Sequence, residues 1–448
     1  MTETPSTTRL QTLRDALDSG TMRPVRRMLS SLHPAEIGSL IESLPNAERE
    51  VVWNLVDPDD AGETLLHVND DMRANLIAGT DEADLLAALE GMEVDDLADI
   101  LDDLPERLTN QVLLSLDQQN RQRLEAVLSY PEDSAGGLMN VDTITVRPDV
   151  ELDVVLRYLR LRGDLPENTD ALFVVNRYNE YMGALNLSDL LTNDTDTAVA
   201  EIMLSDTRPI PADLHENAVA KLFEERDLVS AAVVDEHNKL IGRITIDDVV
   251  DVIRDQADHN IMSLAGLDEE EDVFGPIIPS AKRRALWLLI NLGTAILASW
   301  VINRFQVTID KIVALAVLMP IVASMGGNAG SQTLTLMVRG LALGQVQSSN
   351  ARWLLGKEIA VSLLNGVGLA LLTAGITYIW FNDVSIAIII GVALIINLLI
   401  AAIAGVIIPL FLKQRGTDPA LAGNIVLTTV TDVFGFMVFL GLATLILT

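Results

Sequence analysis

The chain has 448 residues, and its 63 Asp+Glu against 31 Lys+Arg give a formal net charge of −32 at pH 7. This excess of carboxylate argues against nucleic acid and anionic lipid as partners of the soluble part and favours divalent cations, although solubilising surface charge would look the same. The chain has no cysteine, which excludes disulfide bonds and thiolate metal sites.

The charge is unevenly distributed along the chain. Residues 285–448 hold 7 Lys+Arg and 5 Asp+Glu, so almost all of the acid excess lies before residue 285. The sequence therefore predicts an acidic soluble body followed by an apolar membrane part. The first residues lack the apolar core of a signal peptide, and we expect the body to stay in the cytoplasm.

Residues 1–132 are predicted to form an acidic, all-α superhelical domain, because apolar residues recur every three or four positions between prolines. The segment 32–45 resembles the segment 92–105 in pattern, which indicates stacked helical hairpins. In the second segment Asp95 and Asp99 fall on one exposed face, where like charges repel. We expect basic side chains or a metal ion opposite them, with a solvated face as the open alternative.

Residues 133–252 change to short alternating strands and helices, and the pattern occurs twice, at about 139–200 and 201–252. Strands are expected at 172–176 and 231–235, each followed by a turn, a second strand and a helix. The run from Gly242 to Asp248, with the hydroxyl of Thr245, resembles CBS domains, α/β modules that pair and often bind adenine nucleotides. This resemblance makes ATP a candidate ligand of the pair, beside a purely structural role in dimerisation.

Residues 253–280 are predicted to form a connecting helix and a linker. The acids Asp248, Asp251, Asp255 and Asp258 are spaced by three, four and three residues, which places a row of carboxylates on one helix face. A bound cation would stabilise this row and its removal would leave repulsion, as a cation-dependent switch requires. A charged spacer would show the same pattern.

Residues 281–448 contain five apolar stretches long enough to cross a membrane, at 285–302, 312–338, 354–380, 385–412 and 419–447. Basic residues precede the first stretch and lie in the second and fourth links. The positive-inside rule therefore places the N-terminal and CBS domains in the cytoplasm and the C-terminus outside. The expected location is the cell (inner) membrane, crossed several times.

The second stretch is unusually polar for a membrane span. Pro320 is expected to break it, and the run from Gly326 to Gln332 follows at membrane depth. Glycines four residues apart allow two helices to pack closely. The same run of amides and small residues is also typical of segments that handle ions in pores and transporters.

The fifth stretch carries a carboxylate in its middle. Asn424, Thr428, Thr431 and Asp432 are predicted to share one helical face with Gly435. A lone carboxylate at this depth costs about 2.5 to 3.5 kcal/mol, so it needs a polar cavity, a partner or a cation. We favour a cation over a polar clamp satisfied by the neighbouring Thr and Asn side chains.

Pro320, the runs 327–332 and 418–424, and Asp432 after Thr431 together resemble the MgtE family of magnesium channels, and the order of domains matches over essentially the whole chain. The resemblance implies a multidomain membrane protein: an all-α superhelical N domain, an α/β tandem CBS pair, a connecting helix and an α-helical transmembrane domain of five spans. It also implies a homodimer in the lipid bilayer whose pore is lined by the second and fifth spans.

The resemblance implies two sets of magnesium ligands. In the pore Asp432 is the principal ligand, and the lining includes Asn424, Asn328, Gly327 and, on the same helical face as Asp432, Thr428. Cytoplasmic sensing uses acids between the N domain, the CBS pair and the connecting helix, which correspond here to Asp95, Asp99, Asp227, Asp248, Asp251 and Asp418. Asn217, His259 and Asn260 stand where members often have acids, so sensing is expected to shift to Glu216 and Asp258, with Asp255 in the same row.

The expected function is Mg²⁺ uptake through a magnesium-selective channel that closes when cytoplasmic Mg²⁺ binds the acidic N and CBS domains. Mg²⁺ sheds water reluctantly, so two symmetry-related carboxylates gripping a hydrated ion would suit it. A secondary carrier is one alternative, disfavoured because no inverted repeat and no second intramembrane acid are visible. A membrane-anchored Mg²⁺ or nucleotide sensor is the other. No enzyme is expected, since the five histidines are scattered.

Overall fold

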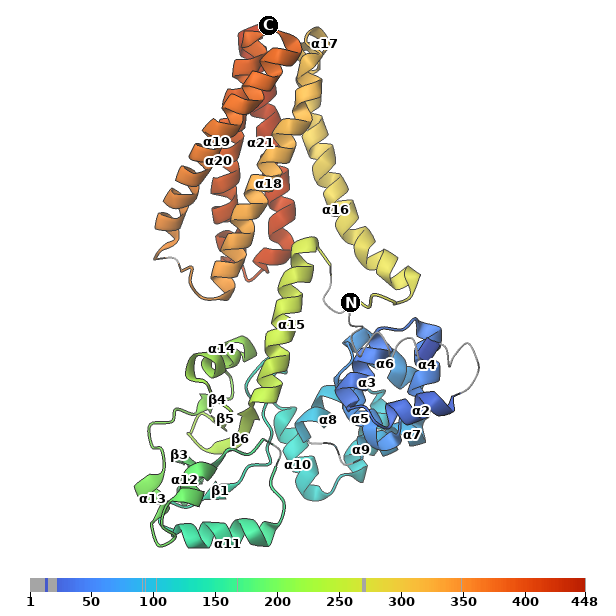
Figure 1. Cartoon of the computed structure of the whole chain (residues 1–448), viewed down its shortest axis with the longest axis vertical. Helices are drawn as coiled ribbons and strands as arrows, with labels where there is room; N and C mark the ends of the chain where they lie inside the picture. Colours follow the sequence, from blue (N-terminus) through green and yellow to red (C-terminus); the bar gives the residue numbers. More distant parts are fainter. Residues whose placement is uncertain are drawn as a thin grey trace. The chain divides into compact units, whose positions relative to one another are not determined.

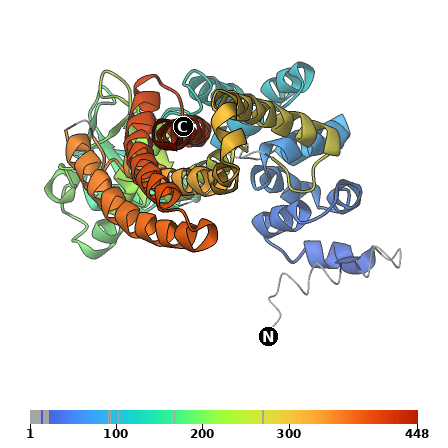
Figure 2. The same ribbon diagram turned by 90° about the horizontal axis from the view of Figure 1, so that it is seen from above.

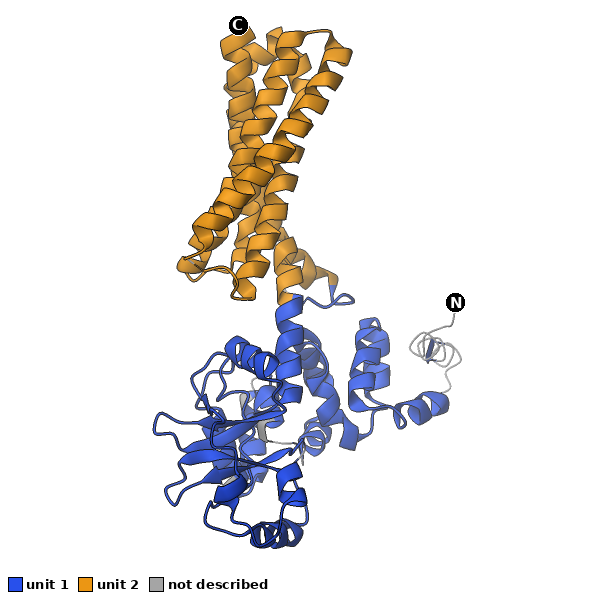
Figure 3. Ribbon diagram, turned by 60° about the vertical axis from the view of Figure 1, so that its left-hand side comes forward, with its two compact units in different colours: residues 1–258, 270–276 blue, residues 259–269, 277–448 orange. Residues whose placement is uncertain are grey.

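The computed structural model describes residues 13–14, 22–90, 92, 94–101, 103–166, 168–267, 271–347 and 349–447. Figures 1 and 2 show its helices and strands from two directions, and Figure 3 colours its two compact units. Unit 1 comprises residues 1–258 and 270–276, and unit 2 comprises residues 259–269 and 277–448.

The first part of unit 1 is helical, as predicted. Its helices are α2 (Arg23–Leu29), α3 (Pro34–Glu42), α4 (Asn46–Trp53), α5 (Pro58–Leu66), α6 (Asp70–Gly79), α7 (Glu82–Leu89), α8 (Val94–Leu101), α9 (Glu106–Ser115) and α10 (Gln118–Val127). Pro34 and Pro58 are the first residues of α3 and α5, where a missing N–H costs nothing. Ile37, Ile41 and Leu65 are fully buried in the core that these helices share.

The second part of unit 1 contains the two predicted α/β modules, each with a three-stranded sheet. The first comprises β1 (Thr145–Val146), α11 (Leu152–Arg162), β2 (Ala171–Val175), β3 (Tyr181–Asn186) and α12 (Leu187–Thr192). The second comprises α13 (Val199–Ile202), β4 (Ile210–Pro211), α14 (Glu216–Arg226), β5 (Ser230–Val234) and β6 (Leu240–Thr245). In both sheets the first strand runs parallel to the middle strand and the last runs antiparallel to it.

The connecting helix and the linker after it belong partly to each unit. Helix α15 runs over Ile246–Ala265, and its residues up to Asp258 are in unit 1. The segment 271–276 returns to unit 1, where the Asp272 carboxylate accepts hydrogen bonds from both terminal nitrogens of Arg49. The linker is therefore fixed to the N-terminal helices immediately before the first membrane helix begins.

Unit 2 contains α16 (Ile277–Asn303), the short α17 (Gln306–Lys311), α18 (Ala314–Ala342), α19 (Ala351–Phe381), α20 (Val384–Gln414) and α21 (Pro419–Leu447). Five of these helices are long and apolar enough to cross a membrane, which confirms the five predicted spans. The prediction that Pro320 breaks the second span is wrong, because α18 continues through it. Pro320 lies inside α18, where its ring removes one i→i−4 hydrogen bond but does not end the helix.

Helix α20 forms the centre of unit 2, with α18, α19 and α21 packed against it. Asn397 of α20 is fully buried, and its Nδ2 donates to the Val322 carbonyl of α18 at 2.9 Å. A Cβ placed on Gly326 of α18 or on Gly435 of α21 would lie 2.3 or 2.8 Å from that same nitrogen. Glycine is therefore required at both positions for the three helices to approach one another around Asn397.

Candidate functional site

Helices α18 and α21, which correspond to the second and fifth predicted spans, pack directly on each other. Leu427 of α21 lies against Gly330 of α18, and Leu334 of α18 lies against Gly423 of α21. Beside these contacts the Ser331 hydroxyl donates to Asn424 Oδ1 at 3.2 Å. The two predicted spans are thus direct neighbours in one chain, and of the predicted pore lining Asn424 contacts α18.

The Asp432 carboxylate is half-buried in the middle of α21. The Thr428 hydroxyl donates to the Asn424 carbonyl at 2.9 Å, and the Thr431 hydroxyl donates to the Thr428 carbonyl at 3.1 Å. Both threonines are therefore satisfied by their own helix backbone, and no described side chain donates to Asp432. The clamp interpretation, in which Thr and Asn hold this carboxylate, finds no support in these contacts.

The polar face predicted on α21 is divided between two environments. Thr431 is fully buried and Gly435 packs against Asn397, so these two residues face the helices of their own unit. Thr428 is exposed, and Asn424 and Asp432 are half-buried at spacings of four residues. Of the five predicted positions, only these three remain accessible to an ion or to a second chain.

Helix α18 also carries exposed polar residues at membrane depth. Ser324, Asn328 and Gln332 are exposed at spacings of four residues, and Asn328 Nδ2 donates to the Ser324 hydroxyl at 3.4 Å. Among the described residues, a Cβ placed on Gly327 meets no atom within 4 Å outside its own part of the helix. In a single chain this stripe would face lipid, which polar side chains avoid.

A second acid is buried in the membrane part, contrary to the prediction that Asp432 is alone there. Glu358 of α19 is 6% exposed, accepts a hydrogen bond from the Thr333 hydroxyl of α18 at 3.2 Å and pairs with Lys357 at 3.3 Å. In the sequence it follows two basic residues near the start of a span, so it looks like a residue at the membrane surface. Only the packing of α18 on α19 reveals its burial.

In unit 1, acids from three elements come close together around α15. The Asp255 side chain is 67% exposed, yet partial desolvation of its carboxylate raises its pKa, Arg254 opposes this, and the charges of Asp251 and of Asp70 on α6 raise it further. Burial likewise raises the pKa of Glu216 on α14, with Asp255 and Asp133 contributing and His215 opposing. Such mutual repulsion is relieved when a cation binds between the carboxylates.

The row of carboxylates on α15 is less unbalanced than predicted. Arg254 lies within 3.4 Å of Asp251 and 3.5 Å of Asp255. At the start of the helix, Asp248 accepts hydrogen bonds from the backbone N–H and the hydroxyl of Thr245, as in a capping box. The Arg254 guanidinium thus partly neutralises Asp251 and Asp255, which the spacing of the acids alone did not reveal.

The remaining predicted sensor residues are more scattered. Asp227 is exposed and ends α14 with a left-handed backbone, φ 52°, and Asp258 is exposed at the boundary of unit 1. Asp99 is exposed on α8, close enough to raise the pKa of Arg73. The side chain of Asp95 lies outside the described residues. The contacts described here do not bring Asp227, Asp258 or Asp99 to the Glu216 and Asp255 carboxylates.

Asp418 belongs to unit 2 and immediately precedes α21, whose start it caps. Its carboxylate accepts from the backbone N–H groups of Ala420 at 2.9 Å and Leu421 at 3.1 Å. His259, in the part of α15 that belongs to unit 2, places Nε2 3.2 Å from Asp418 Oδ2. Family members often have an acid at position 259, and this chain instead supplies the His259 imidazole as a partner for Asp418.

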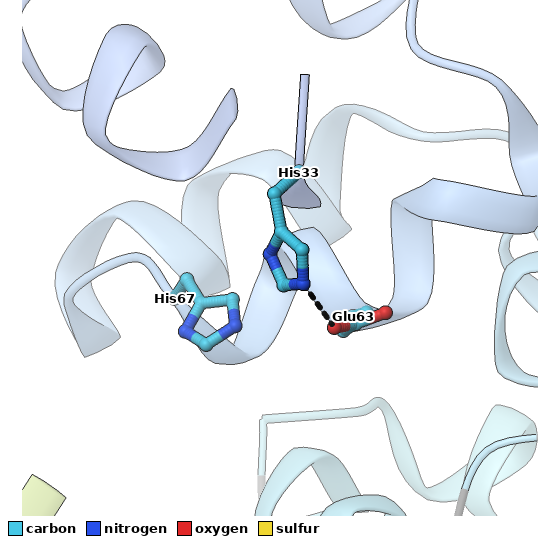
Figure 4. A group of neighbouring side chains, drawn as sticks. All are labelled: His33, Glu63 and His67. Carbon is cyan, nitrogen blue, oxygen red and sulfur yellow. Dashed lines mark ion pairs between the residues drawn. The ribbon is translucent and has the colours of Figure 1, made fainter. Parts of the chain in front are cut away.

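The prediction that the histidines are scattered is wrong for two of them. His33, Glu63 and His67 bring one ligand atom each within 4.8 Å of one another, and His33 Nε2 lies 3.9 Å from Glu63 Oε1 (Figure 4). Burial lowers the pKa of His67, and the Asp251 charge opposes this shift. His33 immediately precedes α3, Glu63 lies within α5 and His67 immediately follows it, and these chain positions gave no sign that the residues meet.

Three protein-family models match the chain, in four stretches. A model described as MgtE, a divalent cation transporter, matches residues 319–442, and the MgtE intracellular N domain matches residues 32–133. The CBS domain matches twice, at residues 135–195 and 199–255.

Individual proteins match over nearly the full length. The chain is 32% identical to a magnesium transporter MgtE of Thermus thermophilus over 440 residues, which cover 97% of this chain and 98% of the relative. It is 26% identical to a magnesium transporter MgtE of Bacillus subtilis, over 96% of this chain and 95% of the relative. Among solved structures it resembles the cytosolic domain of the Mg²⁺ channel MgtE in complex with ATP, at 33% identity and a TM-score of 0.49, over 54% of this chain and 99% of that one.

Proposed function

The chain belongs to the MgtE family of divalent cation transporters, and from this premise we propose that it carries Mg²⁺ across a membrane through a channel lined by α18 and α21. Its relatives are named as magnesium transporters, which supports both the ion and the expectation that the chain is not an enzyme.

The observation that carries the proposal is the carboxylate of Asp432. It is half-buried at membrane depth on a helix whose nearby hydroxyls are already used by backbone carbonyls. An ionised carboxylate in this position is stabilised most simply by a passing cation. Mg²⁺ retains its waters readily, so Asp432 and the amides of Asn424 and Asn328 would contact the hydrated ion.

The exposed polar stripe on α18 supports a homodimer. Ser324, Asn328 and Gln332, with Thr428 on α21, would meet lipid in an isolated chain. A second copy placed with these stripes facing each other would line an aqueous path with both chains and bring two Asp432 carboxylates to it.

Control by cytoplasmic Mg²⁺ would act through the acids of unit 1. Asp251 and Asp255 on α15, Glu216 on α14 and Asp70 on α6 come from different parts of the unit and repel one another. Bound Mg²⁺ would hold these parts together, and its loss would let them separate, with α15 transmitting the change. This arrangement requires the soluble domains to lie on the cytoplasmic side, with the C-terminus outside.

The proposal is tested by Mg²⁺ flux into proteoliposomes that contain the whole chain. Asp432→Asn should abolish flux, while Asp310→Asn, which changes an exposed acid on α17, should leave it intact. Asp251→Asn combined with Asp255→Asn should leave a flux that no longer stops at high cytoplasmic-side Mg²⁺. The control Asp206→Asn, which changes an exposed acid between α13 and β4, should leave a flux that still stops. Normal flux in Asp432→Asn would refute the pore, and no flux from the intact chain would favour a membrane-anchored sensor.

A secondary carrier is a second candidate because of Glu358. This buried acid could take up and release a coupling proton, a role for which the sequence offered no residue. A carrier requires uptake to change with an imposed pH gradient, and Glu358→Gln should remove that dependence. A channel requires flux that follows only the Mg²⁺ gradient and the membrane potential.

ATP is a proposed ligand of the CBS pair. The paired α/β modules have the fold that often binds adenine nucleotides, and the Thr245 hydroxyl is held in place by Asp248 at 3.2 Å. Equilibrium dialysis of radiolabelled ATP against the whole chain tests this, and a loss of binding in Thr245→Val would support it.

A further inference from the structure

His33, Glu63 and His67 lie on elements that are fixed against each other. His33 caps the start of α3, Glu63 lies in α5, and His67 is the residue that ends α5. The two imidazole rings are tilted by 54°, with centroids 6.5 Å apart. All three side chains therefore reach the same small region from two neighbouring helices (Figure 4).

Close packing between α3 and the end of α5 sets this geometry. A Cβ on Gly38 of α3 would lie 2.9 Å from the His67 carbonyl oxygen and 3.1 Å from the His67 Cβ, so only glycine allows the approach. Farther along, Glu42 Oε1 of α3 accepts from the backbone N–H of Asn69 at 3.0 Å. The position of His67 beside His33 is thus determined by backbone contacts on both sides of it.

The spacing of the three ligand atoms suits a metal ion of the zinc type. With bonds of about 2.0 to 2.2 Å, ligand atoms around a tetrahedral ion lie about 3.3 Å apart. The 3.9 Å between His33 Nε2 and Glu63 Oε1 is close to this value. All three ligand atoms lie within 4.8 Å of one another, so small rotations of the side chains bring them to the spacing that an ion requires. Two histidines and one glutamate, with water in the fourth position, form a recurrent zinc ligand set.

One contact of His33 must change when an ion binds. Its Nδ1 accepts a hydrogen bond from the Ala35 N–H at 3.3 Å, which leaves the proton of the neutral ring on Nε2. Coordination through Nε2 moves that proton to Nδ1 and releases this long bond. The other half of the capping box, from the His33 N–H to Glu36, remains.

We propose that His33, Glu63 and His67 form a binding site for a late first-row divalent ion such as Zn²⁺ or Co²⁺, with ligands different from the acids that would bind Mg²⁺. Imidazole nitrogen is preferred by these ions, whereas Mg²⁺ prefers carboxylate, carbonyl and water oxygen. The site therefore selects by ligand type and does not depend on the transport mechanism proposed above.

The test is Co²⁺ binding to the detergent-solubilised whole chain in a large excess of Mg²⁺, which fills the all-oxygen sites. Visible absorption reports a four-coordinate Co²⁺ ion, and equilibrium dialysis gives the stoichiometry. We expect about one Co²⁺ per chain at this site, displaced by Zn²⁺. His67→Asn and Glu63→Gln should each weaken binding by more than the roughly 10- to 100-fold typical of losing an outer-shell partner.

His33→Asn provides the sharpest variant, because asparagine caps a helix well but supplies no imidazole. Its matched control is His215→Asn, since His215 caps α14 through Nδ1 and lies 3.4 Å from Asp133, with no second histidine beside it among the described residues. The proposal predicts that His33→Asn loses the Co²⁺ spectrum and His215→Asn keeps it. Equal binding in both variants, or displacement of Co²⁺ by the excess Mg²⁺, would overturn it.

Discussion

Replacing Arg49 is predicted to release the linker segment 271–276 from the N-terminal helices. Arg49 is 4% exposed, and all five of its N–H donors have acceptors. Nε donates to the Ile41 carbonyl at 3.1 Å, and the two terminal nitrogens form a fork on Asp272, with Nη2 to Oδ1 at 2.8 Å. The Phe274 N–H donates to the same carboxylate at 2.9 Å, so the fork organises the linker backbone as well.

The size of the effect follows from burial on both sides of the pair. Arg49→Met keeps much of the side-chain volume but leaves the Asp272 carboxylate buried without a cation, a change that costs about 3 to 5 kcal/mol. This should raise the population in which the segment is detached by about 150- to 5,000-fold. The control Arg157→Met removes an exposed i,i+4 pair with Asp153 and should cost about 0.5 kcal/mol or less.

Hydrogen exchange of peptides covering 271–276, measured on the whole chain, detects this release. Adding Asp272→Leu to Arg49→Met removes the stranded charge and should restore much of the protection. Burial alone would raise the pKa of Asp272, but its hydrogen bonds with Arg49 and Phe274 outweigh this and hold the pKa below its ordinary value. Since the folded pKa is depressed, protection should be complete above about pH 4 and fall as the pH drops further.

Two results would refute this reasoning. If exchange of the 271–276 peptides in Arg49→Met equals that of the intact chain, the fork does not hold the linker. If Arg49→Met and the double variant exchange equally fast, the stranded Asp272 charge is not the cause of the release.

Three further predictions concern single positions. Gly326→Ala places a Cβ against Asn397 and should lower thermal stability by about 1 to 3 kcal/mol, whereas the adjacent Gly327→Ala meets open space and should be close to neutral in a thermal shift assay. Asp227→Asn should keep the left-handed end of α14 and leave the melting temperature unchanged, while Asp227→Val should cost about 1 to 2 kcal/mol; equal stabilities would contradict the backbone argument. Glu358→Leu removes a buried acid that depends on a hydrogen bond from Thr333, so this variant should be at least as stable as Glu358→Gln. The measurement is the fraction of protein that remains monodisperse in detergent on heating.

Most of the architecture could be predicted because it rests on local patterns. The five spans follow from runs of apolar residues, whose length and composition need no knowledge of neighbours. The paired sheets follow from two repeats of strand, turn and strand, and Pro34 and Pro58 mark helix starts by their own chemistry. The prediction failed at Pro320, because an interior proline removes one hydrogen bond but need not end a helix of a membrane domain.

The contacts between distant residues were decided only by the tertiary structure. Nothing in the sequence around Glu358 shows that α18 covers it. Likewise, nothing in the sequence around His33 shows that His67 packs on Gly38 and so lies beside His33. The same holds for Arg49 and Asp272, which are separated by most of the soluble part of the chain. A sequence pattern records which face of a helix is apolar or charged, whereas the partner of that face depends on how helices far apart in the chain pack together.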